Sequence, residues 1–358
     1  MAITAEQRRA RILDAVRELG SVRVVDLAER IGSAPVTVRR DVAALADSGL
    51  LRRSHGTVSL PLDFTPPSGA MARGRVFGIL VPSVGPYFDE VIAGARAAAQ
   101  TAGVRLVLGI TPYEAADDQA QVAQLLDAGL DGLLLTPNWV PGGDAGESAW
   151  LRELPVPAVL VERIAPPGSA AAELDSVGSD HAHGVLLALR HLLTSGHESV
   201  MLAAREDTWT AHQVRAGYAE AVRLLGIGRG TVIDIHRPGL DTETVASRIA
   251  DAVTRDGVRA VLVHNDREAI RLAPLLRARG LRVPDDLAMI SYDDVFAALA
   301  EPPLTAVAPP KRAVGSVAVE MMIRRLDAGP DLPVHHVRLL PELKVRTSCG
   351  GRGPVTAG

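Results

Sequence analysis

The sequence predicts a multidomain protein in which a small α+β head precedes a two-lobed α/β body with parallel sheets. At 358 residues the chain is too long for one ordinary hydrophobic core. Residues 1–60 carry three short helical patterns and a hairpin pattern, whereas short apolar runs alternate with longer helical patterns from Val76 onward. That alternation is typical of parallel sheets, and its length favours two α/β lobes over one.

Composition places the chain among soluble globular proteins, with 47% hydrophobic and 22% charged residues. The single cysteine, Cys349, excludes a disulfide framework and a multi-cysteine metal site, which fits a reducing compartment. The first residues are charged and amphipathic without an apolar signal core, and no apolar run is long enough to span a membrane. We therefore expect a cytoplasmic protein.

Charge is distributed unevenly along the chain. Residues 1–60 contain 10 Arg and 7 acidic residues, a net charge of +3, whereas residues 61–358 carry a net charge of −7. A small basic head on an acidic body suits a local anionic partner.

The head pattern resolves into helices and a hairpin. A capping box, Thr4 with Gln7, precedes a first helix, and a second carries apolar residues up to a stop at Gly32. A third helix starts at Pro35, which suits the first helical position, and its core face repeats at Val38, Val42 and Leu45. Residues 50–60 then predict two short strands.

Residues 61–74, PLDFTPPSGAMARG, form a linker, because Pro and Gly are frequent and no apolar period is present. The domains are therefore expected at residues 1–60 and 75–348, with a flexible tail at 349–358. A linker of this composition should not be helical.

The body alternates predicted strands and helices. The strands are short, almost wholly apolar runs, as expected for strands buried on both faces; they span 76–81, 105–110, 132–136, 158–162, 199–204, 231–236, 260–265 and 287–292. The helices fill the gaps at 89–102, 115–128, 182–195, 211–225, 242–256, 267–279 and 311–328.

The head resembles the DeoR-type winged helix-turn-helix through VVDLAERIG and VTVRRDVAALADSGLLRRSHGTV. The resemblance implies that the third helix enters the DNA major groove and that the hairpin contacts the backbone. The implied DNA-binding residues are Ser33, Thr37, Arg39, Arg40, Arg52, Arg53 and His55. The family places a capping Ser where this chain has Ala34, so the cap falls on Ser33 or Ala34. The alternative for the arginines is a solvated helix face paired with an acid, and for the hairpin an ordinary polar tip.

The body resembles the sensor domain of lactose-repressor (LacI) type regulators, which is similar to periplasmic sugar-binding proteins (type I). The resemblance runs from ILVPSVGPYFDEVIAGARAAAQTAG through LLDAGLDGLLLTP, VHNDREAI and RARGLRVPDDLAMISYDDV to HHVRLLPELKVRTS. It implies a two-lobed clamp whose chain crosses between lobes near 163–166, 293–304 and 328–334. The N-lobe would comprise 75–163 and 294–328, the C-lobe 164–293 and 329–348, and an effector would bind in the cleft between them.

Polar residues at the predicted strand ends are the effector-binding candidates. Glu162 and Arg163 follow the fourth strand, where the resembled clamps carry an Asp and often an Arg; the alternative is an interlobe salt bridge. Asn265 ends the seventh strand, and its amide can donate and accept at once. Asp293 stands where the family often uses a ligand-binding Asp, while Asp294 is a candidate cap for the next turn.

Aromatic residues at strand ends extend this candidate site. Tyr87 and Phe88 follow the first strand, Trp139 follows the third, and Trp209 precedes the helix at 211–225. They could stack on a ligand ring or plug a lobe boundary. The family's usual clamp arginine aligns with Val214 here, which makes the neighbouring Arg215 the candidate and weakens the case for an ordinary hexose or pentose.

Enzymatic and metal chemistry have little support. His181 and His183 open a predicted helix without a carboxylate at metal-ligand spacing, and the His-Leu and Gly-His steps of the resembled fold account for His191 and His197. No Gly-x-Ser-x-Gly elbow, P-loop or Gly-x-Gly-x-x-Gly motif is present, so no cofactor and no catalysis are expected.

The interpretation is a DNA-binding transcription regulator, a repressor, that binds double-stranded operator DNA as a homodimer. A small polar effector, a sugar or sugar derivative, would control it from the cleft of the body. The alternatives are a sugar-binding protein without regulatory DNA binding and an enzyme acting on a phosphosugar. A non-helical linker predicts loose coupling between head and body.

Overall fold

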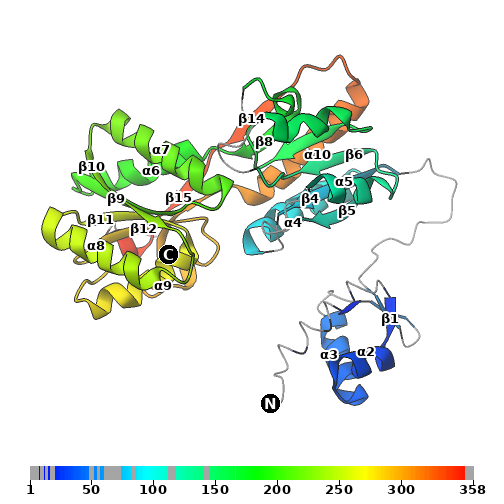
Figure 1. Ribbon diagram of the computed structural model, residues 1–358, viewed down its shortest axis with the longest axis horizontal. Helices are drawn as coiled ribbons and strands as arrows, with labels where there is room; N and C mark the ends of the chain where they lie inside the picture. The colour runs from blue at the N-terminus through cyan, green and yellow to red at the C-terminus, as the bar shows by residue number, and fades with distance from the viewer. Residues whose placement is uncertain are drawn as a thin grey trace, which may run out of the picture. The chain divides into compact units, whose positions relative to one another are not determined.

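The computed structural model describes residues 8, 12, 15–16, 21–47, 52–54, 57–59, 74–82, 85–111, 118–139, 145–165 and 167–350. The chain forms two compact units, residues 1–72 and 73–358, which are taken separately below (Figure 1). Most of the predicted linker, and His55, lie outside the described residues.

The first unit is the predicted head. Its elements are β1 (Ser21–Arg23), α2 (Val24–Ile31), α3 (Pro35–Asp47), β2 (Arg52–Ser54) and β3 (Thr57–Ser59), with an antiparallel sheet in the order β1-β3-β2. The second and third predicted helices and the hairpin are confirmed. The first predicted helix is described only at residues 8, 12, 15 and 16, all helical. Strand β1 was not predicted, because three residues directly before a helix show no alternation.

The junction between α2 and α3 settles which residue caps the third helix. Gly32 adopts φ +69°, and the Ser33 N–H donates to the Ala28 carbonyl (3.1 Å), which closes the end of α2 as a Schellman turn. The Ala34 carbonyl accepts from the N–H groups of Thr37 (2.9 Å) and Val38 (3.1 Å). Ala34 is therefore the N-cap of α3, and Ser33 belongs to the preceding turn.

Replacing Ala34 with Ser should stabilise α3, since a hydroxyl at the N-cap accepts from an otherwise unpaired amide of the first turn. We expect a gain of about 1 kcal/mol, seen as slower amide hydrogen exchange across α3 in the full chain. Ser33→Ala is the control and should leave that exchange nearly unchanged, because its backbone bond persists. Equal effects of the two substitutions would contradict this capping assignment.

The second unit is built on two six-stranded sheets, each with helices on both faces (Figure 1). The first sheet has the order β14-β8-β7-β6-β4-β5 and is parallel throughout. Its strands are β4 (Val76–Val81), β5 (Arg105–Ile110), β6 (Gly132–Leu135), β7 (Ala158–Val161), β8 (Asp175–Ser179) and β14 (His336–Leu339). Its helices are α4 (Pro86–Thr101), α5 (Asp118–Leu126), η2 (Ala145–Glu153), η3 (Ala170–Glu173) and α10 (Lys311–Ala328).

The second sheet has the order β10-β9-β11-β12-β13-β15, with only the β13–β15 pair antiparallel. Its strands are β9 (Ser199–Arg205), β10 (Gly228–Ile235), β11 (Ala260–His264), β12 (Ala288–Tyr292), β13 (Thr305–Ala308) and β15 (Glu342–Lys344). Its helices are α6 (His181–Thr194), α7 (Trp209–Leu225), α8 (Thr242–Asp256), α9 (Asp266–Ala278), η4 (Ala297–Leu299) and η5 (Thr347–Cys349).

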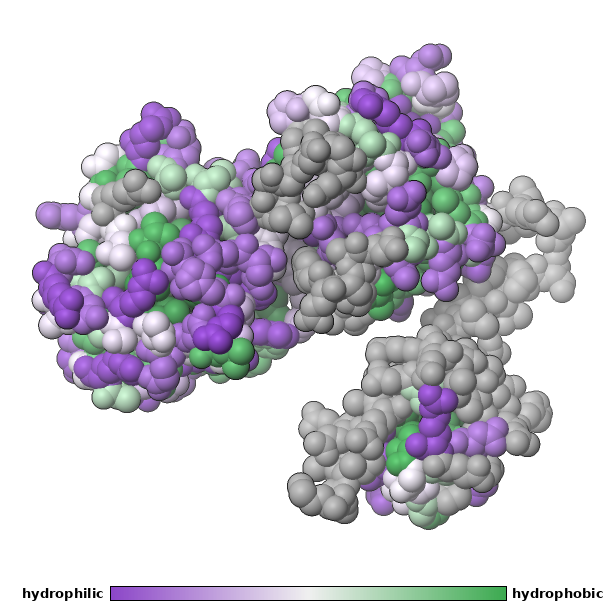
Figure 2. All heavy atoms as spheres, viewed as in Figure 1, coloured by the Kyte–Doolittle hydropathy of each residue, from purple (hydrophilic) through white to green (hydrophobic). Residues whose placement is uncertain are grey.

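Alternate residues of the central strands supply two cores per lobe. On β9, Met201 and Ala203 pack with α8 and α9, whereas Val200 and Leu202 pack with α6 and α7. This confirms the interpretation of the apolar runs as parallel strands covered on both faces. Apolar residues reach the visible surface of the body only in small separate patches (Figure 2). Among the described residues, no helix is both long and apolar enough to cross a membrane.

The predicted crossing points between the lobes are wrong. Because β8 and β14 belong to the first sheet and β13 to the second, the chain crosses after Ser179, at Pro309–Pro310 and at Leu340–Pro341. The first of these errors has a physical cause. Strand β8 reads DSVGS, which is too polar and short to be taken for a buried strand, yet all five of its residues are buried.

The predicted tail begins too early. Ser348 and Cys349 are buried in the second lobe, where the Ser348 hydroxyl donates to the Met289 carbonyl (2.6 Å). The Cys349 sulfur lies 3.0 Å from the Thr305 hydroxyl and 3.2 Å from His191 Nε2. The end of the body therefore extends at least to Cys349.

Candidate functional site

Buried polar atoms gather at the carboxyl ends of the strands in both lobes. Seven of them have no hydrogen-bond partner within the described part of the chain: Thr111 Oγ1 after β5; Thr136 Oγ1, Asn138 Oδ1 and Trp139 Nε1 after β6; His264 Nδ1 and Asn265 Oδ1 at the end of β11; and Asp293 Oδ1 after β12. Each such atom costs about 1–3 kcal/mol in a folded protein. Their concentration at the edge where open parallel sheets bind ligands marks this edge as the candidate site.

Asn265 and Asp293 lie together in the second lobe. Asn265 Nδ2 donates to Asp293 Oδ2 (3.0 Å), which leaves one side-chain oxygen of each residue unpartnered. Asp293 also holds φ +94°, a strained value for a non-glycine residue. Burial, and next the charge of Asp266, raise the pKa of Asp293 to about 7. The site thus presents two neighbouring acceptors, and the assignment of Asn265 and Asp293 to the effector stays a prediction.

The acidic residues near Asp293, Asp294 and Asp266, have different partners. Asp294 pairs with Arg346 (2.7 Å), and the amides of Val295 and Phe296 donate instead to Asp266, at 2.6 and 3.0 Å. The suggestion that Asp294 caps the following turn is therefore wrong, and Asp266 does so.

Glu162 does not offer a free carboxylate. Its Oε1 accepts from the hydroxyls of Ser179 (2.8 Å) and Tyr87 (2.9 Å), and its Oε2 accepts from the Ser179 N–H (3.0 Å). The residue is 5% exposed and holds φ +52°. The expectation that Glu162 binds effector hydroxyls is corrected: its oxygens tie β7 to β8 and to α4.

Glu162→Ala should destabilise the body by about 3 kcal/mol or more, because two buried donors of Ser179 and the half-buried Tyr87 hydroxyl lose their acceptor at once. Urea unfolding measures this directly. Glu173→Ala, which removes an exposed carboxylate paired with Arg152, should leave the urea midpoint almost unchanged. A wild-type midpoint for Glu162→Ala combined with lost effector binding would return Glu162 to the ligand set.

Arg163 is also committed to the protein. Its Nε donates to the Pro137 carbonyl (2.6 Å) and one terminal nitrogen to the Glu162 carbonyl (2.8 Å), with the residue 2% exposed. It holds the ends of β6 and β7 together. Among the described residues, Arg163 forms no interlobe salt bridge, so that alternative is not supported.

Tyr87 and Phe88, at the start of α4, lie in different environments. Phe88 is buried in the first-lobe core with Val91 and Val314, so its assignment to the effector site is wrong. Tyr87 is half-buried, and Lys311 Nζ lies 5.5 Å from its ring centroid. Burial, and next the nearby Glu162 charge, raise the pKa of the Tyr87 hydroxyl well above its usual value, so it remains a donor at neutral pH.

Trp139 and Trp209 meet across the lobes. Trp139 follows β6 of the first lobe and Trp209 begins α7 of the second, and their rings contact edge to face with centroids 5.9 Å apart. Both are half-buried, and Trp139 Nε1 is among the unpartnered donors. The pair fills the boundary between the lobes, and its aromatic faces could also stack on a ligand ring. Both alternatives, a structural role and a ligand contact, are therefore compatible with its position.

Arg215 is occupied by the second sheet. Its Nε donates to the Arg205 carbonyl (2.9 Å), and its two terminal nitrogens donate to Ala204 O (2.6 Å) and Asp234 Oδ1 (2.8 Å). These hydrogen bonds link β9 to β10. The assignment of Arg215 to the effector site is therefore corrected.

Several residues of the site were missed by sequence reasoning: Thr111, Thr136, Asn138 and His264, whose unpartnered atoms are named above, and also Lys311, His181 and Tyr292. Lys311, at the start of α10, donates from Nζ to the Asp293 carbonyl and so joins the lobes. His181 Nδ1 lies 3.0 Å from the Tyr292 hydroxyl, and His181 Nε2 lies 3.7 Å from Glu162 Oε2. Burial lowers the pKa of His181, which keeps it neutral at pH 7. None of these residues lies in a sequence pattern that indicates a ligand site.

The head presents its predicted DNA-binding helix to solvent. Arg39 and Arg40 are exposed on α3, and neither forms an ion pair among the described residues. The acid beside them, Asp41, is buried and pairs with Arg8 (2.6 Å). Thr37 and Ser33 are half-buried, and Arg52 and Arg53 lie in β2.

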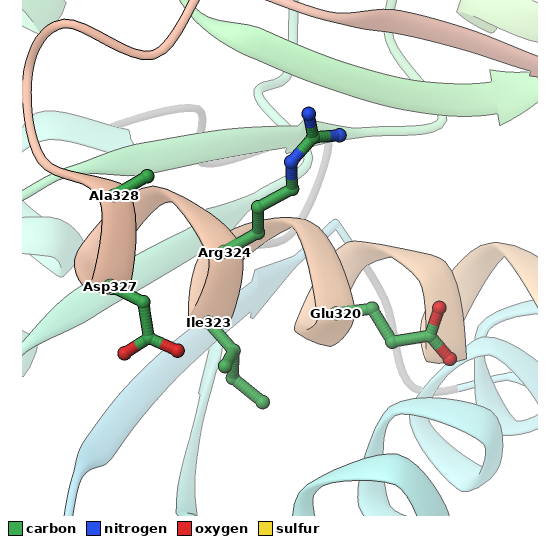
Figure 3. A pocket seen from close by; sticks show the side chains of 5 residues that line it. All are labelled: Glu320, Ile323, Arg324, Asp327 and Ala328. Atoms are coloured by element: carbon green, nitrogen blue, oxygen red, sulfur yellow. The ribbon is translucent and has the colours of Figure 1, made fainter.

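A separate hollow of ≈ 480 Å³ lies along the carboxyl half of α10 (Figure 3). All five lining residues come from this helix: Glu320, Ile323, Arg324, Asp327 and Ala328. Arg324 projects to the opposite side from Ile323 and Asp327 (Figure 3), and Asp327 is paired with Arg75 (2.6 Å). No set of polar atoms converges here among the described side chains, so the strand ends remain the candidate site.

Comparison with known proteins agrees with this architecture. Residues 8–62 match the model of the DeoR-like helix-turn-helix domain, and residues 189–349 match that of the periplasmic binding protein-like domain. The repressor PurR of Photobacterium profundum is 27% identical over 281 residues, covering 76% of this chain and 81% of PurR. The chain joins a DeoR-like helix-turn-helix head to a LacI-type sensor body. It is therefore a DNA-binding transcription regulator.

Solved structures match the LacI-type body in fold. A LacI family regulator from Enterococcus faecium with bound ribose superposes with a TM-score of 0.62 at 21% identity, over 76% of this chain and 98% of the other. The lac repressor dimer bound to operator and the anti-inducer ONPF superposes with a TM-score of 0.65 at 20% identity, over 77% and 94%. The two-lobed LacI-type fold of the body is thereby confirmed.

Proposed function

We propose that the protein is a homodimeric repressor whose DeoR-like heads bind operator DNA and whose LacI-type body binds a hydroxylated, ring-shaped effector, a carbohydrate or its derivative. The unpartnered polar atoms at the strand ends of both lobes carry this proposal. The effector set is Asn265 and Asp293 with Tyr87, Trp139 and Trp209. The DNA set is Thr37, Arg39, Arg40 and the hairpin residues Arg52, Arg53 and His55.

The class of effector follows from the atoms that need partners. Asn265 Oδ1 and Asp293 Oδ1 are neighbouring acceptors, and Trp139 Nε1 is a donor. Sugar hydroxyls both donate and accept, so one ring could serve both kinds of atom. The Trp139–Trp209 pair adds apolar faces suited to a sugar ring or a base. The ribose bound by the Enterococcus faecium regulator supports this class.

Regulation requires that the effector prefer one arrangement of the lobes. Contacts that join the lobes near the proposed effector include Lys311 with the Asp293 carbonyl and Trp139 with Trp209. A ligand bonded to Asp293 and packed against the tryptophans would replace or strengthen both. The coupling must be reciprocal, so operator DNA must weaken effector binding by the factor by which the effector weakens DNA binding.

Dimerisation is proposed on physical grounds. One head of this size buries too little surface for tight specific binding, whereas two heads on a two-part operator suffice. The lac repressor dimer bound to operator supports this assembly. A monomer by light scattering at a concentration that saturates the operator would contradict it.

Two measurements test the function. Thermal-shift screening of sugars, nucleosides and sugar phosphates should find at least one ligand that raises the melting temperature, and that ligand should change tryptophan fluorescence. A gel shift on the DNA upstream of the gene should give a complex that this ligand alters. Ligand binding without any DNA complex would favour a sugar-binding protein instead.

A further inference from the structure

The outward face of α3 combines two cations with an exposed aliphatic side chain. Val36 is 72% exposed, whereas Val38 and Val42 on the opposite face are fully buried. Val36 shares its face with Arg40, because residues four apart lie one above the other on a helix. Among the described residues of the head, Val36 is the large hydrophobic side chain that solvent reaches.

Exposure alone does not assign a role, since single aliphatic residues are common on protein surfaces. Position does. Ala34 is the N-cap, so Val36 lies in the first turn of α3, and the first turn of a recognition helix is the part that contacts base edges. Helical side chains tilt toward the N-terminus, which directs Val36 ahead of the arginines.

The chemistry of the major groove limits what Val36 could contact. Its side chain has no hydrogen-bonding atom, so it cannot pair with the donors and acceptors that guanine, cytosine and adenine present. Thymine alone offers a methyl group there, and apolar contact with that methyl discriminates thymine from the other bases.

We propose that Val36 is a specificity-determining residue that packs against the C5 methyl of one thymine in each operator half-site. Val36 and Arg40 are separated by about 6 Å along the helix axis, and base pairs are about 3.4 Å apart. The thymine therefore lies about one to two base pairs from the base pair beside Arg40, since a helix in the major groove is inclined to the DNA axis. This inference rests on the proposed DNA binding and adds a base preference to it.

The test removes single methyl groups from the DNA. The operator is first selected from random duplexes with the full chain, and each thymine of the site is then replaced in turn by deoxyuridine. Wild-type protein should lose about fourfold in affinity at one thymine per half-site, and about sixteenfold when both half-sites are changed. Val36→Ala should bind the thymine and deoxyuridine duplexes equally at that position.

Two further variants separate base reading from general affinity. Val36→Thr keeps the shape of the side chain but replaces one methyl with a hydroxyl, and should reduce the thymine preference without affecting folding. Arg40→Ala should weaken binding to the thymine and deoxyuridine duplexes alike. If every deoxyuridine duplex binds within twofold of the original, or if Val36→Ala keeps the preference, the contact does not exist. Failure of the wild-type chain to bind any duplex would instead reject DNA binding, and this inference with it.

Discussion

Replacing Arg39 and Arg40 with Ala should abolish operator binding and leave effector binding intact. Both arginines are exposed on α3 and lack an acidic partner among the described residues, so their charges are available to DNA. An arginine contact contributes about 1–3 kcal/mol, and a dimer loses four of them. We expect an affinity loss of about 1,000-fold or more in a gel shift.

Salt dependence distinguishes a contact with DNA from damage to the fold. Each phosphate contact that is lost lowers the slope of log affinity against log salt by about 0.9. Arg248 and Arg255, exposed on α8 of the body, supply a charge-matched control: replacing both with Ala should leave affinity and slope unchanged. Comparable losses in the control would show that net charge, and not the face of α3, governs binding.

Much of the body was predictable because its strands are apolar and its helices periodic. The runs at β4, β9 and β11 are almost wholly buried, which is the environment their composition indicates. Strand β8 is an exception. In β8 the buried Asp175 is compensated by Arg325 (2.9 Å) and by the His335 N–H (2.7 Å), residues about 150 positions away. No local pattern reveals such compensation.

The candidate site, like the body, could be predicted from the sequence in part. Asn265 and Asp293 were found because they follow apolar runs, and strand ends meet at one edge of a parallel sheet. Glu162 follows such a run too, but its oxygens are consumed by Ser179, the last residue of the strand that was missed. Lys311 joins the site only because the chain crosses between lobes at Pro309–Pro310. Residue type and position predict where a side chain lies, and not whether its atoms are already bonded.

Asp293→Asn should stabilise the protein at alkaline pH while weakening effector binding. Burial raises the pKa of Asp293 from 3.8 to about 7 in the folded protein. A raised carboxyl pKa means that its contribution to stability is complete below about pH 4 and is lost as pH rises through 7. Asparagine does not ionise and avoids this loss. We expect the variant to exceed wild type by about 2–4 kcal/mol in free energy of unfolding at pH 8, and by nearly nothing at pH 4.

Comparing the two proteins at each pH isolates this carboxyl, because the buried His264, whose pKa lies at about 3, changes both curves equally. Asp285→Asn, at an exposed surface acid, should show no such gain. For the effector the expectation reverses: an ionised Asp293 accepts a hydroxyl more strongly than a neutral amide, so the variant should bind about 10- to 100-fold more weakly at pH 8. A variant that is more stable at pH 8 yet binds the effector as wild type does would remove Asp293 from the effector site. In that case the strained Asp293 carboxylate would have a role in the fold only.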